Sequence, residues 1–473
     1  MTDLLIRNTA AIVTGLPGAA ARHAGPDIRL RQGRITALGQ LTPEPGETIL
    51  DATDCVAYPA WVNTHHHLFQ SLLKGDPLGL NATLTPWLTA IPYRYRAAFD
   101  ADLFRLAARI GLVELALSGC GTVADHNYLY APGLDFDTSA ILFEEAAALG
   151  LRFVLLRGGQ TRSRQVESTL PQALRPETPE AYLADIQRLA AAYHDPAPDA
   201  WRKVAVAPTT PLHAVHPQEL DLFAAEARRL GLRLHSHLSE TVSYQDAAQD
   251  MHGTTPIRFC ADHGWLGPDV SFAHLVKLDP EEIRLLGQTH TGIAHCPQSN
   301  GRLGSGIAPV LALEAAGAQI SIGVDGAASN EAADMLSETH AAWLMQRARN
   351  GEAARPHCRG GQGEAQAAAA PTVEDVVRWG SAGGADLLGL TGLGRLAVGQ
   401  AADIALYRLD QPCHLGLHDP AIGPVAGGKA TLKRLLVGGK TVVEDGRIPG
   451  LDLAQLSHQA RAGVTQLRQG AAG

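Results

Sequence analysis

The chain has 473 residues, of which 45% are hydrophobic and 18% charged, a composition typical of a soluble globular protein with one large domain and a smaller companion. Its formal net charge of −9 offers no basic surface for phosphate groups, which argues against nucleic acid as a partner. Six cysteines lack CxxC spacing, the first residues MTDLLIRNTA carry an early Asp and no long apolar run, and no stretch approaches 18 uninterrupted apolar residues. We therefore expect reduced thiols, a cytoplasmic location and no membrane anchor.

The first part of the chain, residues 1–57, contains short segments in which apolar and polar residues alternate. These segments are LLIRNTAAIV, DIRLRQGRITALG and ETILDA, and they predict strands of a small β-sandwich. Residues 58–393 change to brief apolar strands followed by longer Ala- and Leu-rich helices, as in VAVAPTTP and PQELDLFAAEARRLG. This alternation predicts an α/β fold with a parallel sheet, and the number of units favours a (β/α)8 barrel of the TIM type over an open sheet.

The last part, residues 394–473, returns to the strand pattern with QAADIALYRL and ATLKRLLVGGKTVVEDG and then ends in a helix. We expect these strands to complete the N-terminal sandwich, so that residues 1–57 and 394–473 form one discontinuous β domain. The Gly-, Ala- and polar-rich residues 349–371 are expected to be a mobile surface loop between elements of the barrel.

Three consecutive histidines end the first strand of the barrel region, in YPAWVNTHHHLFQ. Alternate side chains of an extended strand share a face, so His65 and His67 can converge on one ion while His66 points away. Taken alone, the motif is equally compatible with a polar strand end at the surface.

Three later strand ends carry residues of the same kind. LRLHSHLSE contains His235 and His237, with Glu240 three residues on, VSFAHLVKL ends a strand at His274, and ISIGVDGAASNE ends one at Asp325. A lone histidine is more often a core residue, and a lone Asp before Gly is more often a turn former. Because active sites of (β/α)8 enzymes are assembled from the C-terminal ends of several strands, four such ends together predict one metal site.

The segments NTHHH, HSHLSE, FAHLV, VDGAASN and GRLAVGQAADIAL resemble the amidohydrolase superfamily, in its cytosine-deaminase-like branch, over nearly the whole chain. SGCGTVADH and HCPQSNGRLGSG are most similar to isoxanthopterin (pterin) and 8-oxoguanine deaminases. The resemblance implies His65, His67, His237 and Asp325 as ligands of one divalent metal ion, zinc with iron as the alternative. The segment LRFVLLRGG is consistent with one metal ion rather than two, because it has no Lys that could form a carbamate bridge between two metals.

The expected chemistry follows from this ligand set. Three neutral imidazoles and one carboxylate leave a divalent ion with positive charge and an open position, which lowers the pKa of water toward about 7. Asp325 could accept the proton of that water while His274 orients it. Glu240 could protonate a ring nitrogen and then the departing amine, although a carboxylate favoured by a helix start is an alternative interpretation of Glu240.

Three further side chains are candidate substrate contacts. Gln70 follows the histidines closely, and its amide could pair with a lactam-like edge of a heterocycle. Trp87 could stack on a planar ring, and a core position is an equal alternative. Arg157 ends another predicted strand and could bind a ring carbonyl, with a structural ion pair as the alternative.

We therefore expect a hydrolytic deaminase that releases ammonia from a small 2-amino-oxo nitrogen heterocycle. Arg162 and Arg164 favour isoxanthopterin as the substrate, with 8-oxoguanine or isocytosine as alternatives, and His126 is expected to serve packing or substrate hydrogen bonding. A triazine chlorohydrolase or N-dealkylase on the same scaffold is a further alternative. A non-catalytic barrel should have lost ligands that are present here. A homo-oligomer is expected, since such assemblies are common among soluble enzymes.

Overall fold

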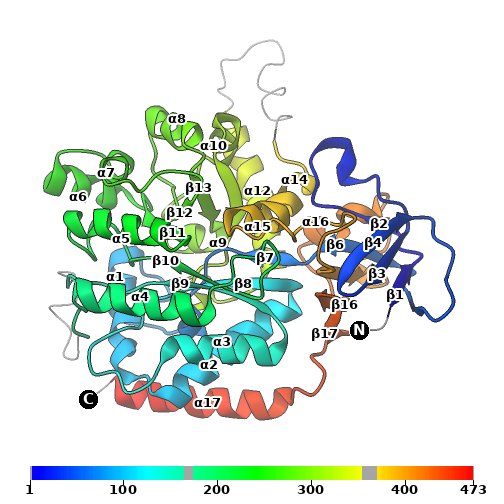
Figure 1. Ribbon diagram of the computed structural model, residues 1–473, viewed down its shortest axis with the longest axis horizontal. Helices are drawn as coiled ribbons and strands as arrows, with labels where there is room; N and C mark the ends of the chain where they lie inside the picture. Colours follow the sequence, from blue (N-terminus) through cyan, green and yellow to red (C-terminus); the bar gives the residue numbers. More distant parts are fainter. Residues whose placement is uncertain (1–2, 164–173, 354–369, 472–473) are drawn as a thin grey trace.

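The computed structural model describes residues 3–163, 174–353 and 370–471. Its centre is an eight-stranded parallel sheet whose strands follow one another in chain order, with helices around it (Figure 1). The strands are β7 (Trp61–Asn63), β8 (Cys120–Asn127), β9 (Arg152–Arg157), β10 (Arg202–Val206), β11 (Arg233–Leu238), β12 (Val270–His274), β13 (Gly292–His295) and β14 (Gln319–Ile322).

The two edge strands of this sheet, β7 and β14, are joined through the residues that follow them. The Thr64 N–H donates to the Ile322 carbonyl at 3.2 Å, and the Asp325 N–H donates to the His65 carbonyl at 3.0 Å. These bonds close the sheet into the predicted (β/α)8 barrel, and the closure places the ends of the first and last strands side by side.

The barrel helices bury one apolar side against the strands. In the longest early helix, Asp100 caps the N-terminus by accepting from the Leu103 N–H, and Phe104, Ala107 and Gly111 are buried at helical spacing. The main helices are α2 (Ala101–Leu117), α3 (Thr138–Leu149), α4 (Pro179–Tyr193), α5 (Pro217–Arg229), α6 (Val242–His252), α7 (Pro256–Asp262), α8 (Pro280–Gln288), α9 (Pro297–Arg302), α10 (Val310–Ala316), α12 (Met335–Ala353) and α14 (Val373–Arg378). Shorter helices include η2 (Leu68–Leu72), α1 (Leu84–Leu88), α11 (Ala327–Asn330), α15 (Gly384–Leu387) and α16 (Gly423–Gly427).

The terminal segments of the chain form two further sheets beside the barrel (Figure 1). One has the order β4-β3-β1-β5 and the other β17-β16-β15-β6-β2, so strands from both ends of the chain share the second sheet. Apolar side chains of both sheets, among them Ile28 and Ile404, form a separate core. The contribution of both chain ends is confirmed, whereas the boundaries at residues 57 and 393 stay predictions. The strands are β1 (Leu4–Arg7), β2 (Ala11–Ile12), β3 (Asp27–Arg31), β4 (Arg34–Gly39), β5 (Thr48–Asp51), β6 (Cys55–Pro59), β15 (Ile404–Arg408), β16 (Leu432–Val437) and β17 (Lys440–Glu444).

Two segments differ in detail from the expectation. The C-terminal helix α17 (Leu453–Gly470) runs along α2 of the barrel, where Gly463 permits close approach to Leu103 and Leu106 (Figure 1). This helix therefore covers the barrel, although it follows the last sandwich strand. Of the predicted loop at residues 349–371, the first residues continue helix α12, and residues 354–369 lie outside the described part of the chain.

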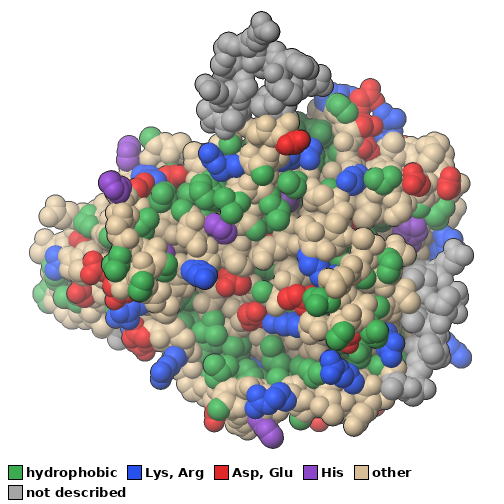
Figure 2. Space-filling model, turned by 180° about the vertical axis from the view of Figure 1, so that it is seen from behind, with side chains coloured by type: hydrophobic (Ala, Val, Ile, Leu, Met, Phe, Trp, Pro, Cys, Tyr) green, Lys and Arg blue, Asp and Glu red, His purple; other side chains and the backbone are tan. Residues whose placement is uncertain are grey.

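The surface mixes charges of both signs. On the face that Figure 2 shows, Lys and Arg side chains are interspersed with Asp and Glu. The five cysteines of the described ranges are all free thiols, and four of them are buried. Among the helices described, none has the length and apolar character needed to cross a lipid bilayer.

Candidate metal centre and active site

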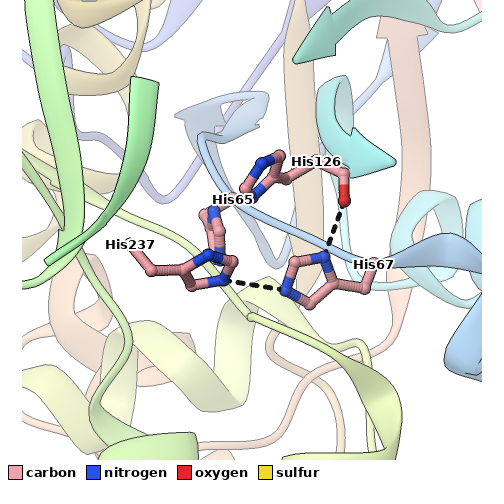
Figure 3. A group of neighbouring side chains, drawn as sticks. All are labelled: His65, His67, His126 and His237. Carbon is pink, nitrogen blue, oxygen red and sulfur yellow. Dashed lines mark hydrogen bonds between the residues drawn. The ribbon is translucent and has the colours of Figure 1, made fainter. Parts of the chain in front are cut away.

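The side chains predicted to bind a metal meet at the point where the barrel closes. His65 and His67 follow β7, and their Nε2 atoms lie 3.4 and 3.2 Å from Oδ1 of Asp325, which follows β14. His66 points away, and its Nδ1 binds the backbone carbonyl of Asp325. His237 comes from β11, and its Nε2 faces that of His67 at 3.1 Å (Figure 3).

Hydrogen bonds behind these rings fix their tautomers. Nδ1 of His67 donates to the His126 carbonyl, and Nδ1 of His237 donates to the Thr209 carbonyl, both at 2.7 Å. Because a carbonyl only accepts, each Nδ1 carries the proton and each Nε2 carries a lone pair. Two lone pairs 3.1 Å apart repel each other, but they suit a shared cation. Nitrogens bound tetrahedrally to zinc at about 2.0–2.1 Å lie roughly 3.3 Å apart.

His65 is oriented by side chains rather than by a carbonyl. Its Nδ1 lies 2.9 Å from Nε2 of His235, whose own Nδ1 lies 2.9 Å from the Ser271 hydroxyl. The Nε2 of His65 is buried and makes no hydrogen bond within the described structure. Such an unpartnered atom costs about 1–3 kcal/mol, so a metal ion would supply the missing partner. Burial lowers the pKa of His65 to about 4, which keeps the imidazole in its neutral, ligating form.

Asp325 divides its two oxygens between protein and metal site. Oδ2 accepts from the Ser299 hydroxyl at 2.6 Å and from the Ser329 hydroxyl at 3.3 Å, while Oδ1 faces the two histidines of the first strand. Burial alone would raise the pKa of Asp325. Because Nε2 of His67 turns a lone pair toward Oδ1, a cation shared with the histidines is what would keep this carboxylate ionised. One carboxylate and three neutral imidazoles form a donor set that fits zinc.

His126 also lies beside this centre, as its expected packing role allows. Its Nε2 donates to the Ala207 carbonyl at 2.7 Å, and its Nδ1 has no hydrogen-bond partner among the residues described. Its ring centroid is 4.7 Å from that of His237. Two overlapping sets of residues bring their potential ligand atoms within 4.8 Å of one another: His65, His67, His126 and His237, and His65, His237, His274 and Asp325.

The predicted proton-transfer residues stand together at the edge of this centre. Nε2 of His274 lies 3.7 Å from Oε2 of Glu240, and Nδ1 of His274 is held by Oδ1 of Asn300 at 2.9 Å. Oε1 of Glu240 accepts from the Ser305 hydroxyl at 3.1 Å. Helix α6 begins only at Val242, and the Glu240 carboxylate is buried. This position favours the catalytic interpretation of Glu240 over that of a helix-start carboxylate.

A pocket beside the histidines contains the predicted Gln70 and Trp87. Nε2 of Gln70 donates to the Tyr128 hydroxyl at 2.9 Å, and its Oε1 is buried without a hydrogen-bond partner in the described structure. The indole N–H of Trp87 donates to the Ala328 carbonyl at 3.0 Å, which leaves carbon surface for the pocket. The pocket therefore combines an apolar wall with a free carbonyl oxygen near the metal ligands.

Other pocket residues were missed by the sequence analysis. Tyr128 comes directly after β8 and Thr209 shortly after β10, so position after a strand end was the only signal that could have found them. Loop paths leave no periodic pattern in a sequence. The pocket residues not singled out are Leu84, Leu88, Tyr93, Tyr128, Thr209, Thr210, Tyr244 and Leu303.

Arg157 does not reach this pocket. Its guanidinium is buried and paired with Glu177 at 2.6 Å and with Asp185 at 3.0 Å. Because both carboxylates already neutralise it, we correct the predicted substrate contact: Arg157 forms the structural ion pair that was its alternative. Arg162 is not among the pocket residues either, and Arg164 lies outside the described part of the chain.

Comparisons with known proteins agree with this site. The sequence profile of the Amidohydrolase family matches residues 56–442. The chain is 64% identical to an isoxanthopterin deaminase of an unknown prokaryotic organism over 467 residues, which cover 98% of this chain and 97% of that protein. It is 38% identical to an 8-oxoguanine deaminase of Pseudomonas aeruginosa, covering 99% of this chain and 100% of the relative.

A solved structure adds a metal to this comparison. The crystal structure of an atrazine chlorohydrolase from Arthrobacter aurescens TC1, complexed with zinc, matches with a TM-score of 0.85 and 28% identity. The match covers 98% of this chain and 100% of that one. The expected superfamily is thus confirmed, and with it a metal-dependent hydrolase that acts on C–N bonds of cyclic compounds. The chain belongs to the amidohydrolase family.

Proposed function

We propose that the protein is a zinc-dependent deaminase of isoxanthopterin. In this reaction water replaces the exocyclic amino group of the ring, and the products are the oxo compound and ammonia. The observation that carries the proposal is the 64% identity, over nearly the whole chain, to an isoxanthopterin deaminase. The pocket supports it, because a free carbonyl oxygen and a buried carboxylate lie beside the proposed ligands.

His65, His67, His237 and Asp325 would hold the metal ion. When bound, a divalent ion supplies Lewis acidity and lowers the pKa of water toward about 7. The Asp325 carboxylate is the base nearest to the histidines and accepts the proton of the attacking water at Oδ1. His274 has its proton on Nδ1, fixed by Asn300, so its Nε2 accepts a hydrogen bond from the same water and orients it.

Glu240 carries the proton to the leaving group. Its carboxylate is buried in the pocket wall and 3.7 Å from His274, so it can protonate a ring nitrogen next to the carbon under attack. Protonation draws electrons from that carbon and favours addition of water. Glu240, now ionised, takes up the proton that Asp325 received from the water and passes it to the amino group, which leaves as ammonia. The hydroxyl proton of the adduct then returns to Glu240 as the C=O bond forms.

Gln70 and Trp87 would place the ring. Oε1 of Gln70 has no hydrogen-bond partner in the described structure and accepts an N–H from the lactam edge of the heterocycle. Its amide N–H already donates to Tyr128, which leaves Oε1 as the group available to the ring. Trp87 covers the ring with carbon surface.

Ammonia release from a panel of heterocycles tests the proposal. The zinc-loaded protein is incubated with isoxanthopterin, 8-oxoguanine and isocytosine, and kcat/KM for ammonia release is measured for each. Atrazine has no primary amino group, so release of chloride or alkylamine is measured with it instead. We expect the highest value for isoxanthopterin, and a value lower by roughly 10²–10⁴-fold for the same preparation carrying Glu240→Gln. A protein that releases no ammonia from isoxanthopterin would refute the assignment.

8-Oxoguanine is the second candidate substrate, favoured by the 38% identity to an 8-oxoguanine deaminase over the full length of both chains. Both compounds are fused-ring lactams with an amino group between two ring nitrogens, so the same residues could serve either. A higher kcat/KM for 8-oxoguanine than for isoxanthopterin would select this candidate.

We infer zinc rather than iron, because imidazole and carboxylate ligands suit zinc and a zinc-complexed structure of 28% identity shares the fold. Elemental analysis of the purified protein should find about one zinc per chain. The homo-oligomeric state, the cytoplasmic location and the lack of a nucleic-acid partner stay predictions.

A further inference from the structure

A second cavity lies at the opposite end of the barrel from the metal centre. Lys203, the second residue of β10, and Arg233, the first residue of β11, are among its walls. The metal centre uses the C-terminal ends of the strands, so these N-terminal ends face the other side of the barrel. The cavity holds about 170 Å³. A water molecule occupies about 30 Å³ of liquid, so a small anion with several waters would fit.

The positive groups of this cavity have no carboxylate paired with them in the described structure. Asp195 lies near Lys203, but it is exposed and accepts from the Ala197 N–H, and its charge only partly offsets the burial of the ammonium. Only 7% of Lys203 is exposed, and among the described residues neither Lys203 nor Arg233 forms an ion pair. The cavity walls include no carboxylate from the parts of the chain described. Two carboxylates near Arg233 are already engaged, Asp269 with Arg228 at 2.8 Å and Asp386 with Arg395 at 2.5 Å.

A buried ammonium without a partner is costly for a folded protein. Burial, followed by repulsion from Arg233, lowers the pKa of Lys203, and burial also lowers the pKa of Arg233. Both directions indicate cations that a bound negative charge would stabilise.

Hydrogen-bond donors surround the same space. Nδ1 of His194 accepts from the Val204 N–H at 3.2 Å, so the proton of the neutral ring lies on Nε2 and can be donated. Arg233 uses one N–H group for the Pro268 carbonyl at 2.7 Å and keeps others for a ligand. Gly389, at φ 67°, makes room for this guanidinium, because a Cβ there would lie 2.7 Å from Nε of Arg233.

We propose that this cavity is a binding site for a small oxyanion, held between the Lys203 ammonium and the Arg233 guanidinium with a further hydrogen bond from His194. Phosphate and carboxylate share the chemistry that these donors recognise. Ser271 and His235 form the inner wall, and His235 holds Nδ1 of His65. The anion would therefore bind one imidazole away from the metal ligands without touching them.

Calorimetric titration of the zinc-loaded protein tests this site. Inorganic phosphate and acetate are titrated separately into the wild type, Lys203→Met, Arg233→Met and the control Arg202→Met. Arg202 precedes Lys203 on the same strand but is exposed, so its loss removes an equal charge outside the cavity. We expect at least about tenfold weaker binding in the two cavity variants and less than about twofold change in the control. The anion bound more tightly by the wild type identifies the class.

Phosphate could also bind at the metal, and the variants separate the two sites. Equal affinity in all four proteins, or no binding of either anion by the wild type, would overturn the proposal. Lys203→Met should fold and melt at least as high as the wild type without anion, because it replaces an unpaired buried charge with an apolar chain. Added anion should raise the melting temperature of the wild type but should leave that of Lys203→Met unchanged. This variant therefore decides the question even if Arg233→Met does not fold.

Discussion

At the scale of single residues, the two oxygens of Asp325 have separate tasks. Oδ2 is held by Ser299 and Ser329, and Oδ1 faces His65 and His67. Asp325→Asn keeps the shape but removes the negative charge and the proton acceptor. We expect kcat to fall by roughly 10²–10⁴-fold and metal affinity to fall by at least about tenfold, measured by steady-state kinetics and by elemental analysis after dialysis.

Ser329→Ala is the matched control, because it removes only the longer of the two bonds to Oδ2. This variant should retain metal and lose less than about tenfold in kcat. Asp325→Asn with undiminished metal content and turnover would show that this carboxylate is neither ligand nor base.

Glu240 differs from Asp325 because it does not take part in the ligand cluster. Glu240→Gln keeps the volume and the hydrogen bond with Ser305 but cannot carry a proton. We expect kcat to fall by roughly 10²–10⁴-fold while bound zinc stays at the wild-type level. The measurement is kcat together with zinc content. Ser305→Ala serves as control and should lose far less, whereas a Glu240→Gln enzyme within tenfold of wild-type kcat would exclude proton transfer by this residue.

At the scale of elements, Arg157 links the end of β9 to the segment that begins α4. Its partners are Glu177, just before α4, and Asp185 on α4. Removing one member of a buried ion pair leaves uncompensated charge, so Arg157→Met should lower the free energy of unfolding by about 3–5 kcal/mol, measured by urea titration. Arg188→Met is the control, since Arg188 is 48% exposed and its pairs should contribute at most about 1 kcal/mol.

The same experiment separates structure from substrate binding. KM of folded Arg157→Met should remain near that of the wild type, because the guanidinium lies outside the pocket. A large rise in KM without loss of stability would restore the substrate role that the sequence suggested.

The ends of the strands were the most predictable feature of the site. His65, His67, His237 and Asp325 each come at or just after a short apolar run, and parallel strands in a barrel bring such positions to one end. The partners of Arg157 could not be predicted in the same way, because Glu177 and Asp185 come from a loop and a helix later in the chain. The sequence around an arginine at a strand end is the same whether the guanidinium binds a substrate or pairs with two carboxylates of the protein.

At the scale of the whole molecule, the order of predicted strands, helices and turns along the chain was enough to predict the barrel and the sheet shared by the two chain ends. The pattern changes from strands and turns to strand–helix alternation near residue 58 and back again near residue 394, and β6 and β15 indeed pair from opposite ends of the chain. The same pattern of elements could not predict that α17 packs on α2. The sequence of an amphipathic helix shows that one side is apolar, but it does not show which surface that side packs against.

The metal site joins the parts of the barrel that are farthest apart in the chain. Two proposed ligands follow the first strand, one lies on the fifth and one follows the last, beside the seam between β7 and β14. A bound ion would therefore stabilise the closed barrel as a unit. Removal of the metal with a chelator should abolish turnover and lower the melting temperature by at least about 5 °C, since binding at 1,000 times Kd contributes about 4 kcal/mol.

Returning zinc should restore both activity and melting temperature, as measured by ammonia release and by circular dichroism during heating. His237→Ala is the control, because a chain lacking one ligand should melt at nearly the same temperature with and without chelator. The seam explains why the effect should be global: the Thr64 and Asp325 N–H groups help to close the barrel there, next to nitrogen lone pairs that repel each other without a cation. A metal-free protein that melts like the zinc-loaded one would mean that these four groups do not share an ion.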